Sequence, residues 1–245
     1  MKNIIDFIRL LKKPKVLSLL LKKQPVSLSS FRNVENLKKS FKQINTVIDA
    51  GANKGQFALA ANYYFPHSNI FSFEPSKLAY KQIFRYLGNY KNIKLFNYGL
   101  GDVDGEIEFY EHTYDQISSF LKINPTNSNP NYKDSKASTS KVIVKKLDDV
   151  IEEIELISPV LLKLDVQGFE DRVLKGALKS LKNIDYILIE LAFEKLYEDQ
   201  LLFNEMNGLL NSLGYNFIVP VGFNYGDDNR IIEVDALFRK DELKN

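Results

Sequence analysis

The chain has 245 residues, a length that fits one large α/β domain or one domain with a small extension. Its net charge of +2 gives no overall electrostatic footprint for nucleic acid, so we expect no nucleic-acid partner. The absence of cysteine and the presence of only two histidines exclude disulfides, thiol catalysis and metal sites built on several Cys or His ligands. Any metal ion would need oxygen ligands, and we assign no residue as a metal ligand.

Residues 1–45 are predicted to form a helical, lysine-rich extension. Four apolar residues recur at helical spacing before Pro14: Ile4, Ile5, Ile8 and Leu11. Charged residues interrupt each apolar run and no small-residue cleavage site follows, which argues against a signal peptide or a membrane anchor. We expect this segment to pack on the domain or on a partner. We also expect the protein to be cytoplasmic. Peripheral contact with an anionic membrane through its lysines is the alternative.

From residue 46 to residue 240, strands and helices alternate in what we interpret as one domain. The expected strands lie at residues 46–49, 69–75, 92–99, 159–165 and 186–191. The expected helices lie at residues 55–65, 76–88, 147–156, 170–182 and 199–214. Such alternation with apolar strands predicts an α/β fold, in which a mostly parallel, doubly wound sheet carries helices on both faces.

Two further pairs of strands are expected. Residues 105–111 alternate strictly between polar and apolar side chains, and they could pair with residues 140–147. Residues 215–220 and 231–240 have no helix between them, so we expect an antiparallel pair at the C-terminal edge of the sheet.

The segment 122–140 differs from its surroundings. It is rich in Asn, Ser and Pro and has no apolar period. Structureless loops of this length are uncommon inside a compact domain. We therefore expect either a lid over a binding site or a disordered loop.

Acidic residues follow several of the expected strands. Sheets of this kind bind ligands outside the carboxyl ends of their strands, at the point where the strand order reverses. This rule makes five strand-end acids candidate site residues: Asp49, Glu74, Asp102, Asp165 and Glu190.

The sequence VIDAGANKGQF, residues 47–57, predicts a strand, a glycine turn and a helix. Gly51 and Gly55 would let the backbone approach a ligand, and the helix would offer free N–H groups. Asn53 occupies the place of the second glycine of the dinucleotide motif, but asparagine tolerates a left-handed turn. Glu74 ends the next strand about 20 residues further on, where an acid can bind the hydroxyls of a ribose.

With these motifs the sequence resembles the FkbM-type methyltransferases over roughly residues 46–239. The resemblance is carried, in order, by VIDAGANKGQF, FEPS, YGLGDVDGEIEFYE, ISSF, KKLDDV, LLKLDVQGFEDRVLKGA, ILIE and VDALFRK. It implies a class I, Rossmann-like fold and an enzyme that uses S-adenosylmethionine. Many members of this family methylate hydroxyls on sugars or polyketides.

The resemblance also implies roles for individual residues. Asp49 and the turn with Gly51, Asn53 and Gly55 would contact the methionine part of the cofactor. Glu74 would bind the ribose. Three further expected contacts follow later strands: Gly101 and Asp102 near the adenine, and Ser119 near the cofactor. Ser118 would face the acceptor.

The motif LLKLDVQGFE places three polar residues behind a buried strand. On the methyltransferase interpretation, Asp165 would orient an acceptor hydroxyl and accept its proton, or would bind a divalent cation. Gln167 would contact the acceptor, and Glu190 is a second candidate for the catalytic acid. The alternative is that Asp165 or Gln167 caps the following helix, while Glu170 interacts with the positive end of that helix.

We therefore expect methyl transfer from S-adenosylmethionine to oxygen, on a glycan or a related saccharide acceptor. A nicotinamide-dependent oxidoreductase is the second hypothesis, although the missing glycine and the antiparallel C-terminal pair argue against it. The third is a non-catalytic binding module of the same fold. Acids at every expected strand end argue against that hypothesis.

Overall fold

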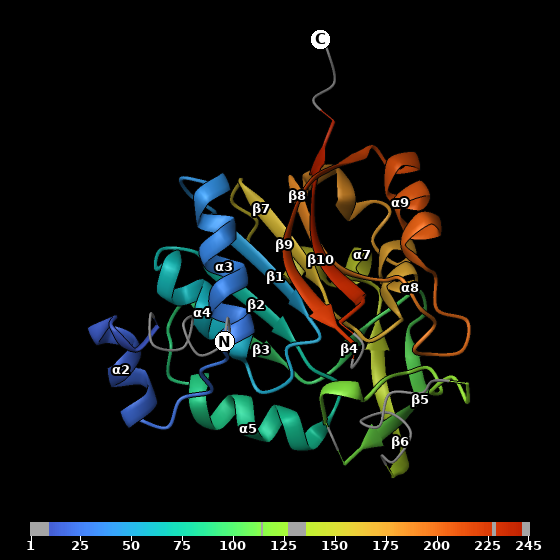
Figure 1. Ribbon diagram of the computed structural model, residues 1–245, viewed down its shortest axis with the longest axis horizontal. Helices are drawn as coiled ribbons and strands as arrows, with labels where there is room; N and C mark the ends of the chain where they lie inside the picture. Colours follow the sequence, from blue (N-terminus) through green and yellow to red (C-terminus); the bar gives the residue numbers. More distant parts are fainter. Residues whose placement is uncertain (1–9, 114, 127–135, 227–228, 242–245) are drawn as a thin grey trace.

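The computed structural model describes residues 10–113, 115–126, 136–226 and 229–241. Its centre is a seven-stranded sheet with the order β3-β2-β1-β7-β8-β10-β9 (Figure 1). The strands of this sheet are β1 (Thr46–Ala50), β2 (Asn69–Phe73), β3 (Ile93–Phe96), β7 (Val160–Leu164), β8 (Tyr186–Ala192), β9 (Tyr215–Tyr225) and β10 (Ile231–Lys240). The first five are parallel, and β10 pairs antiparallel with both β8 and β9. This architecture confirms the predicted mostly parallel α/β sheet with an antiparallel edge.

Helices cover both faces of the sheet. On one face lie α2 (Pro14–Leu21), α3 (Leu28–Ser40), α4 (Gln56–Tyr64) and α5 (Lys77–Leu87). On the other lie α7 (Leu147–Val150), α8 (Glu170–Lys175) and α9 (Phe203–Ser212). Successive strand residues belong to opposite cores, since Val47 and Leu161 pack with the first group and Ile48 and Leu162 with the second. Near-continuous apolar strands are the sequence signature of such double coverage.

A second, three-stranded sheet contains β4 (Gly99–Leu100), β6 (Ala137–Lys145) and β5 (Gly105–His112) in that order. The antiparallel pairing of β5 with β6 confirms the expected extra pair of strands. However, β6 begins inside the segment predicted as a loop. Its first residues are exposed on both faces and therefore show no apolar alternation, although their backbone pairs with β5. Residues 127–135 of the expected loop lie outside the described part of the chain.

Several other elements are shorter than predicted, among them the helix expected at 199–214, which is α9 over Phe203–Ser212. The strand expected at 92–99 ends at Phe96, and the chain then enters the second sheet. The helix expected at 170–182 ends at Lys175, because Gly176 passes so close to Gly101 that an added Cβ would lie 1.8 Å from the Gly101 carbonyl oxygen. The segment 147–156 forms only α7 and a 3₁₀ turn at Ile151–Glu153.

The described part of the N-terminal segment packs on the main domain. Phe31, Val34 and Leu37 of α3 are buried in the same core as α4, beside which α3 lies in Figure 1. Leu10 is also buried there, whereas the rest of the helix expected over residues 4–11 lies almost wholly outside the described residues. The extension and the domain thus share one hydrophobic core.

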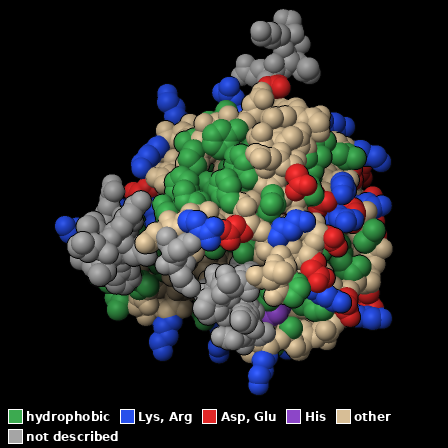
Figure 2. Space-filling model, turned by 45° about the vertical axis from the view of Figure 1, so that its right-hand side comes forward, with side chains coloured by type: hydrophobic (Ala, Val, Ile, Leu, Met, Phe, Trp, Pro, Cys, Tyr) green, Lys and Arg blue, Asp and Glu red, His purple; other side chains and the backbone are tan. Residues whose placement is uncertain are grey.

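No helix in the described ranges has both the length and the apolar run that a membrane crossing requires. On the face shown in Figure 2, basic and acidic side chains lie interspersed over the surface. The short N-terminal helix α2 leaves Leu21 exposed while Val16 faces the core.

The shared core predicts that Phe31 stabilises the whole domain. Its ring is buried against Tyr63 and Tyr64 at centroid distances of 5.5 and 6.1 Å. Phe31→Ala should lower the free energy of unfolding by about 3–5 kcal/mol, measured by urea denaturation. Leu21→Ala is the control, because Leu21 is 77% exposed and its truncation should change little. Equal stability of the two variants would show that α3 adds nothing to the core.

Candidate active site

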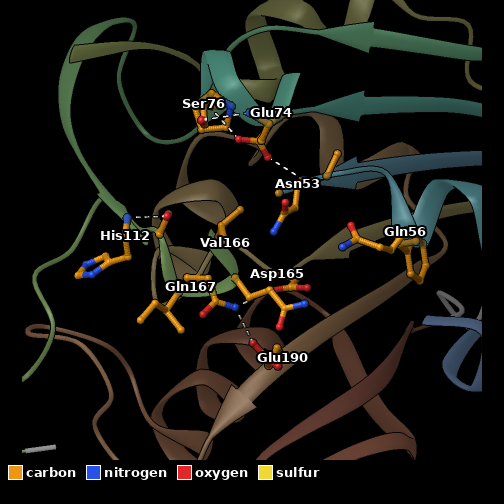
Figure 3. Close-up of a pocket in the computed structure, with 18 of the residues that line it drawn as sticks. Asn53, Gln56, Glu74, Ser76, His112, Asp165, Val166, Gln167 and Glu190 are labelled. Atoms are coloured by element: carbon orange, nitrogen blue, oxygen red, sulfur yellow. Dashed lines mark hydrogen bonds between the residues drawn. The ribbon is translucent and has the colours of Figure 1, made fainter. Parts of the chain in front are cut away.

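A large cavity lies at the carboxyl ends of the parallel strands, where the order reverses between β1 and β7. Its volume is about 720 Å³. The described residues that line it include Ser27, Gly51, Asn53, Glu74, Gly99, Leu100, Ser118, Lys163, Asp165, Gln167, Glu190, Asn224 and Glu233. Figure 3 shows Glu74 and Asn53 on one side of this space and Asp165, Gln167 and Glu190 on the other.

The glycine turn after β1 has the left-handed conformations that the sequence predicts. The φ angles of Gly51, Asn53 and Gly55 are 75°, 47° and 85°. Gly51 lines the cavity, and an added Cβ there would lie 1.9 Å from the carbonyl oxygen of Asp165. Glycine is therefore required because β1 and β7 approach each other, as well as for access to the cavity. Gly55 does not line the cavity, and an added Cβ would instead meet side chains of α5.

Glu74 is fixed at the end of β2 by the backbone. Its Oε2 accepts a hydrogen bond from the Asn53 N–H at 2.7 Å, and its Oε1 accepts one from the Ser76 N–H at 2.8 Å. Burial raises the pKa of Glu74 to about 7. Because each carboxylate oxygen can accept more than one hydrogen bond, Glu74 can still accept hydroxyl donors from the cavity.

Lys163 is one of the cavity residues that sequence reasoning missed. It interrupts the apolar strand β7, and its Nζ lies 3.1 Å from Oδ1 of Asp49 and 3.5 Å from Oδ2 of Asp165. Burial alone would lower the pKa of Lys163, but the attraction of Asp49 and then of Asp165 raises it above its ordinary value. Asp49 itself is fully buried, also accepts a hydrogen bond from Ser72, and does not line the cavity. Asp49 thus contacts Lys163, and its expected contact with the cofactor stays a prediction.

Gln167 connects the two candidate catalytic acids. Its Nε2 donates to Oδ1 of Asp165 at 2.8 Å and to Oε2 of Glu190 at 3.1 Å. Tyr197 fixes this orientation, because its hydroxyl donates to Oε1 of Gln167 at 2.8 Å. The buried Ser119 donates to the carbonyl oxygen of Gln167 at 2.5 Å. Ser119 therefore supports the turn and does not line the cavity, whereas its neighbour Ser118 does.

A further acid, Glu233, lies on strand β10 of the antiparallel edge and is linked to Glu190 through Asn224. Nδ2 of Asn224 donates to Oε1 of Glu190 at 2.9 Å and to Oε2 of Glu233 at 3.1 Å. Burial raises the pKa of Glu233 to about 8, and burial together with Glu233 raises the pKa of Glu190 well above its ordinary value. The sequence analysis missed Asn224 and Glu233, because the pairing of β10 with β8 brings Glu233 to the site and the pairing of β9 with β10 brings Asn224. Glu233 could have been found from the sequence, because it is a charged residue inside the apolar strand β10.

Helix α8 does not use Asp165 as its cap. Oε1 of Glu170 accepts hydrogen bonds from the N–H groups of Val166 and Gly168 at 3.0 and 3.3 Å. The N-cap residue Phe169 makes no side-chain cap. Glu170 thus has the structural role at this turn, and Asp165 faces the cavity with 40% of its side chain exposed.

Gly101 and Asp102 lie away from the cavity. An added Cβ at Gly101 would meet Val144 and Phe169, and Asp102 pairs with Arg172 at 3.3 Å. The chain reaches the cavity two residues earlier, at Gly99 and Leu100, because β3 ends early. The expected contact of Gly101 and Asp102 with the adenine stays a prediction.

Five carboxyl groups line the cavity, and Lys163 is the ammonium among the described lining residues. The acids are Glu74, Glu111, Asp165, Glu190 and Glu233. Such a lining favours cationic or hydroxyl-bearing ligands over anions. Within the described ranges, no three His, Cys, Asp or Glu side chains are arranged to hold a metal ion.

The sequence is similar to those of known methyltransferases. The methyltransferase FkbM domain matches residues 49–217. The 2-O-methyltransferase NoeI of Sinorhizobium fredii is 28% identical over 80% of this chain and 80% of its own length. The hexuronic acid methyltransferase AglP of Haloferax volcanii is 24% identical over 58% of this chain and 54% of its own length.

Solved structures show a weaker similarity. A methyltransferase from Listeria monocytogenes, described as S-adenosylmethionine-dependent, aligns with a TM-score of 0.49 at 9% identity, covering 86% of this chain and 99% of its own. The strand order and the cavity at its reversal are those of a class I methyltransferase fold. Because the family match covers most of the chain, this protein belongs to the FkbM methyltransferase family.

Proposed function

We propose that this methyltransferase transfers a methyl group from S-adenosylmethionine to a hydroxyl oxygen of a saccharide. The observation that carries the proposal is Glu74, a carboxylate fixed by two backbone N–H groups beside a glycine turn. Across the same cavity lies Asp165, which can receive a proton. A donor and an acceptor could therefore meet between these two acids.

The residues around the glycine turn suit the cofactor. S-adenosylmethionine supplies an activated methyl group on its sulfonium. Glu74 would bind its ribose hydroxyls, and the apolar Leu100 and Leu78 would border its adenine. Oδ1 of Asn53 is buried and has no hydrogen-bond donor among the described residues, so it would accept from the ammonium of the methionine part. The amino end of α4 would favour the methionine carboxylate.

The opposite wall suits a hydroxyl-bearing acceptor. Asp165, Glu190 and Glu233 offer acceptor oxygens, and Gln167 and Asn224 fix their positions. The names of the two relatives, a 2-O-methyltransferase and a hexuronic acid methyltransferase, support a saccharide acceptor. The segment 122–140 follows Ser118, which lines the cavity, so we propose that it acts on the acceptor.

Asp165 is the residue we assign as proton acceptor. Gln167 and Lys163 hold its two oxygens, which keeps the carboxylate aimed at the cavity. Glu190 is less suited to this role, because Gln167 and Asn224 donate to its two oxygens and because burial raises its pKa above the ordinary value, which disfavours the ionised form. We assign Glu190 to orient the acceptor by donating or accepting a hydrogen bond.

The alternatives separate by experiment. The nicotinamide-dependent oxidoreductase is not retained, since the chain belongs to a methyltransferase family. A non-catalytic module of this fold would bind the cofactor without turnover. Saccharides extracted from the source cells, incubated with the protein and methyl-labelled S-adenosylmethionine, should gain a labelled methyl ether detectable by mass spectrometry. Label on nitrogen, or no label despite cofactor binding, would overturn the proposal.

The expected absence of nucleic-acid partners, the alternative of peripheral membrane contact and the expected cytoplasmic location stay predictions.

Glu74→Ala should weaken binding of S-adenosylhomocysteine by about tenfold or more. The variant loses charge-assisted hydrogen bonds worth about 1.5–3 kcal/mol each. Isothermal titration calorimetry measures the change, and Glu106→Ala is the control because Glu106 is exposed on β5. Unchanged affinity in a folded Glu74→Ala variant would exclude the assigned role.

Binding of S-adenosylhomocysteine should also depend on pH. Burial raises the pKa of Glu74 to about 7, so the free protein loses the ionised form as the pH falls through that value. The ionised form accepts more hydrogen bonds, and affinity should therefore decrease from about pH 8 to about pH 6. Glu74→Gln should flatten this dependence. An equally steep profile in that variant would assign the titration to another group.

Asp165→Asn should lower kcat by about 10²–10⁴ while the affinity for S-adenosylhomocysteine changes little. Asparagine keeps the shape of the side chain but accepts a proton poorly. Turnover is measured with the saccharide extract, and Asp149→Asn serves as control because Asp149 is exposed on α7 outside the cavity. Parent-like turnover of Asp165→Asn would move the assignment to Glu190.

A further inference from the structure

Lys163 has an unusual set of contacts for a buried lysine. Its side chain is 6% exposed, and four oxygen atoms surround its Nζ. Two are the carboxylate oxygens of Asp49 and Asp165, at 3.1 and 3.5 Å. The others are the carbonyl oxygens of Ala50 and Gly51, at 3.2 and 2.8 Å. The ammonium donates hydrogen bonds to the two carbonyl oxygens, and the two carboxylates are its ion-pair partners.

These contacts join both halves of the cavity. Lys163 stands opposite Asp49 in the register of β7 and β1. Its carbonyl partners belong to the glycine turn on the side of Glu74, and Asp165 faces the opposite wall. One side chain thus contacts both the expected donor side and the expected acceptor side.

Stability alone is a weak reason for this arrangement. Buried ion pairs can often be replaced by apolar residues of similar volume without loss of stability, because burial of the two charges is costly. A neutral pair at Asp49 and Lys163 would avoid that cost. The positive charge of Lys163 is better explained by its contacts with the two carbonyl groups and with Asp165, because an apolar side chain could not make these contacts.

We propose that Lys163 is a positioning residue, whose ammonium fixes the Gly51 turn and Asp165 relative to each other. The inference rests on the proposed function only in naming what each side binds. Loss of the ammonium leaves the Gly51 carbonyl without this donor and leaves the carboxylate of Asp165 held by Gln167, whereas the Ala50 carbonyl still accepts from the Asp165 N–H at 3.4 Å.

The test uses a double variant, since Lys163→Met by itself leaves Asp49 as an uncompensated buried charge and endangers folding. In Asp49→Asn/Lys163→Met both charges are removed, and the asparagine keeps an oxygen for Ser72. Asp49→Asn alone is the matched reference, because Lys163 retains its carbonyl partners and Asp165. Three quantities are compared: the melting temperature, the Kd for S-adenosylhomocysteine by calorimetry, and the hydrogen-exchange rates of backbone amides.

The double variant should melt within a few degrees of the reference but bind S-adenosylhomocysteine at least tenfold more weakly. The amide protons of Gly51 and Ala52, which donate to the Phe73 carbonyl at 3.1 Å, should exchange at least tenfold faster. The amide of Leu188 in the adjacent strand β8 should exchange at the reference rate. A role limited to neutralising Asp49 predicts the reference Kd and reference exchange rates in the double variant.

The outcomes separate the two proposals. Parent protein that does not bind S-adenosylhomocysteine contradicts the proposed function, and the exchange rates still decide the role of Lys163. Reference exchange rates at Gly51 and Ala52 would overturn the positioning role even if Kd changed. Faster exchange at Leu188 as well would show general loosening of the sheet, which also overturns it.

Discussion

The turn after β1 and the end of β7 lie so close together that the cavity depends on their contact. At Gly51 an added methyl group would overlap the carbonyl oxygen of Asp165. From this contact the chain leaves β1 toward α4 and β7 toward α8, on opposite faces of the sheet. The divergence opens the space that the acids surround, so a side chain at this one position would displace both walls.

Charge is distributed unevenly around that space. Carboxylates gather at the strand ends, and Lys163 offsets only those nearest to it. The acids farther out, Glu190 and Glu233, have raised pKa values because burial disfavours two adjacent negative charges. The neutral side-chain amides of Gln167 and Asn224 donate hydrogen bonds to these acids and so fix their positions without a cation. The result is a rigid wall of oxygen atoms that can accept hydrogen bonds from hydroxyls.

Sequence reasoning predicted the features that depend on local pattern. The parallel strands, the left-handed turn at Asn53 and the placement of Glu74 follow from apolar runs and strand ends. It could not predict contacts between distant segments. Lys163 was overlooked because a lysine does not fit an apolar strand unless its partner Asp49 is known. The pairing of Asp102 with Arg172 was not foreseen, because the chain leaves the main sheet at Phe96, a break that the continuous run 92–99 conceals.

Both ends of the chain contribute to the cavity. Ser27 lines it from the N-terminal side and Glu233 from β10, and Nδ2 of Asn33 donates to Oδ2 of Asp235 at 2.7 Å. Contacts of such large sequence separation form late, because a long loop must close first. The parallel core can therefore assemble before β10 joins the sheet. The cavity becomes complete only when β10 has paired with β8, so a chain that has not yet made this pairing presents no finished binding site.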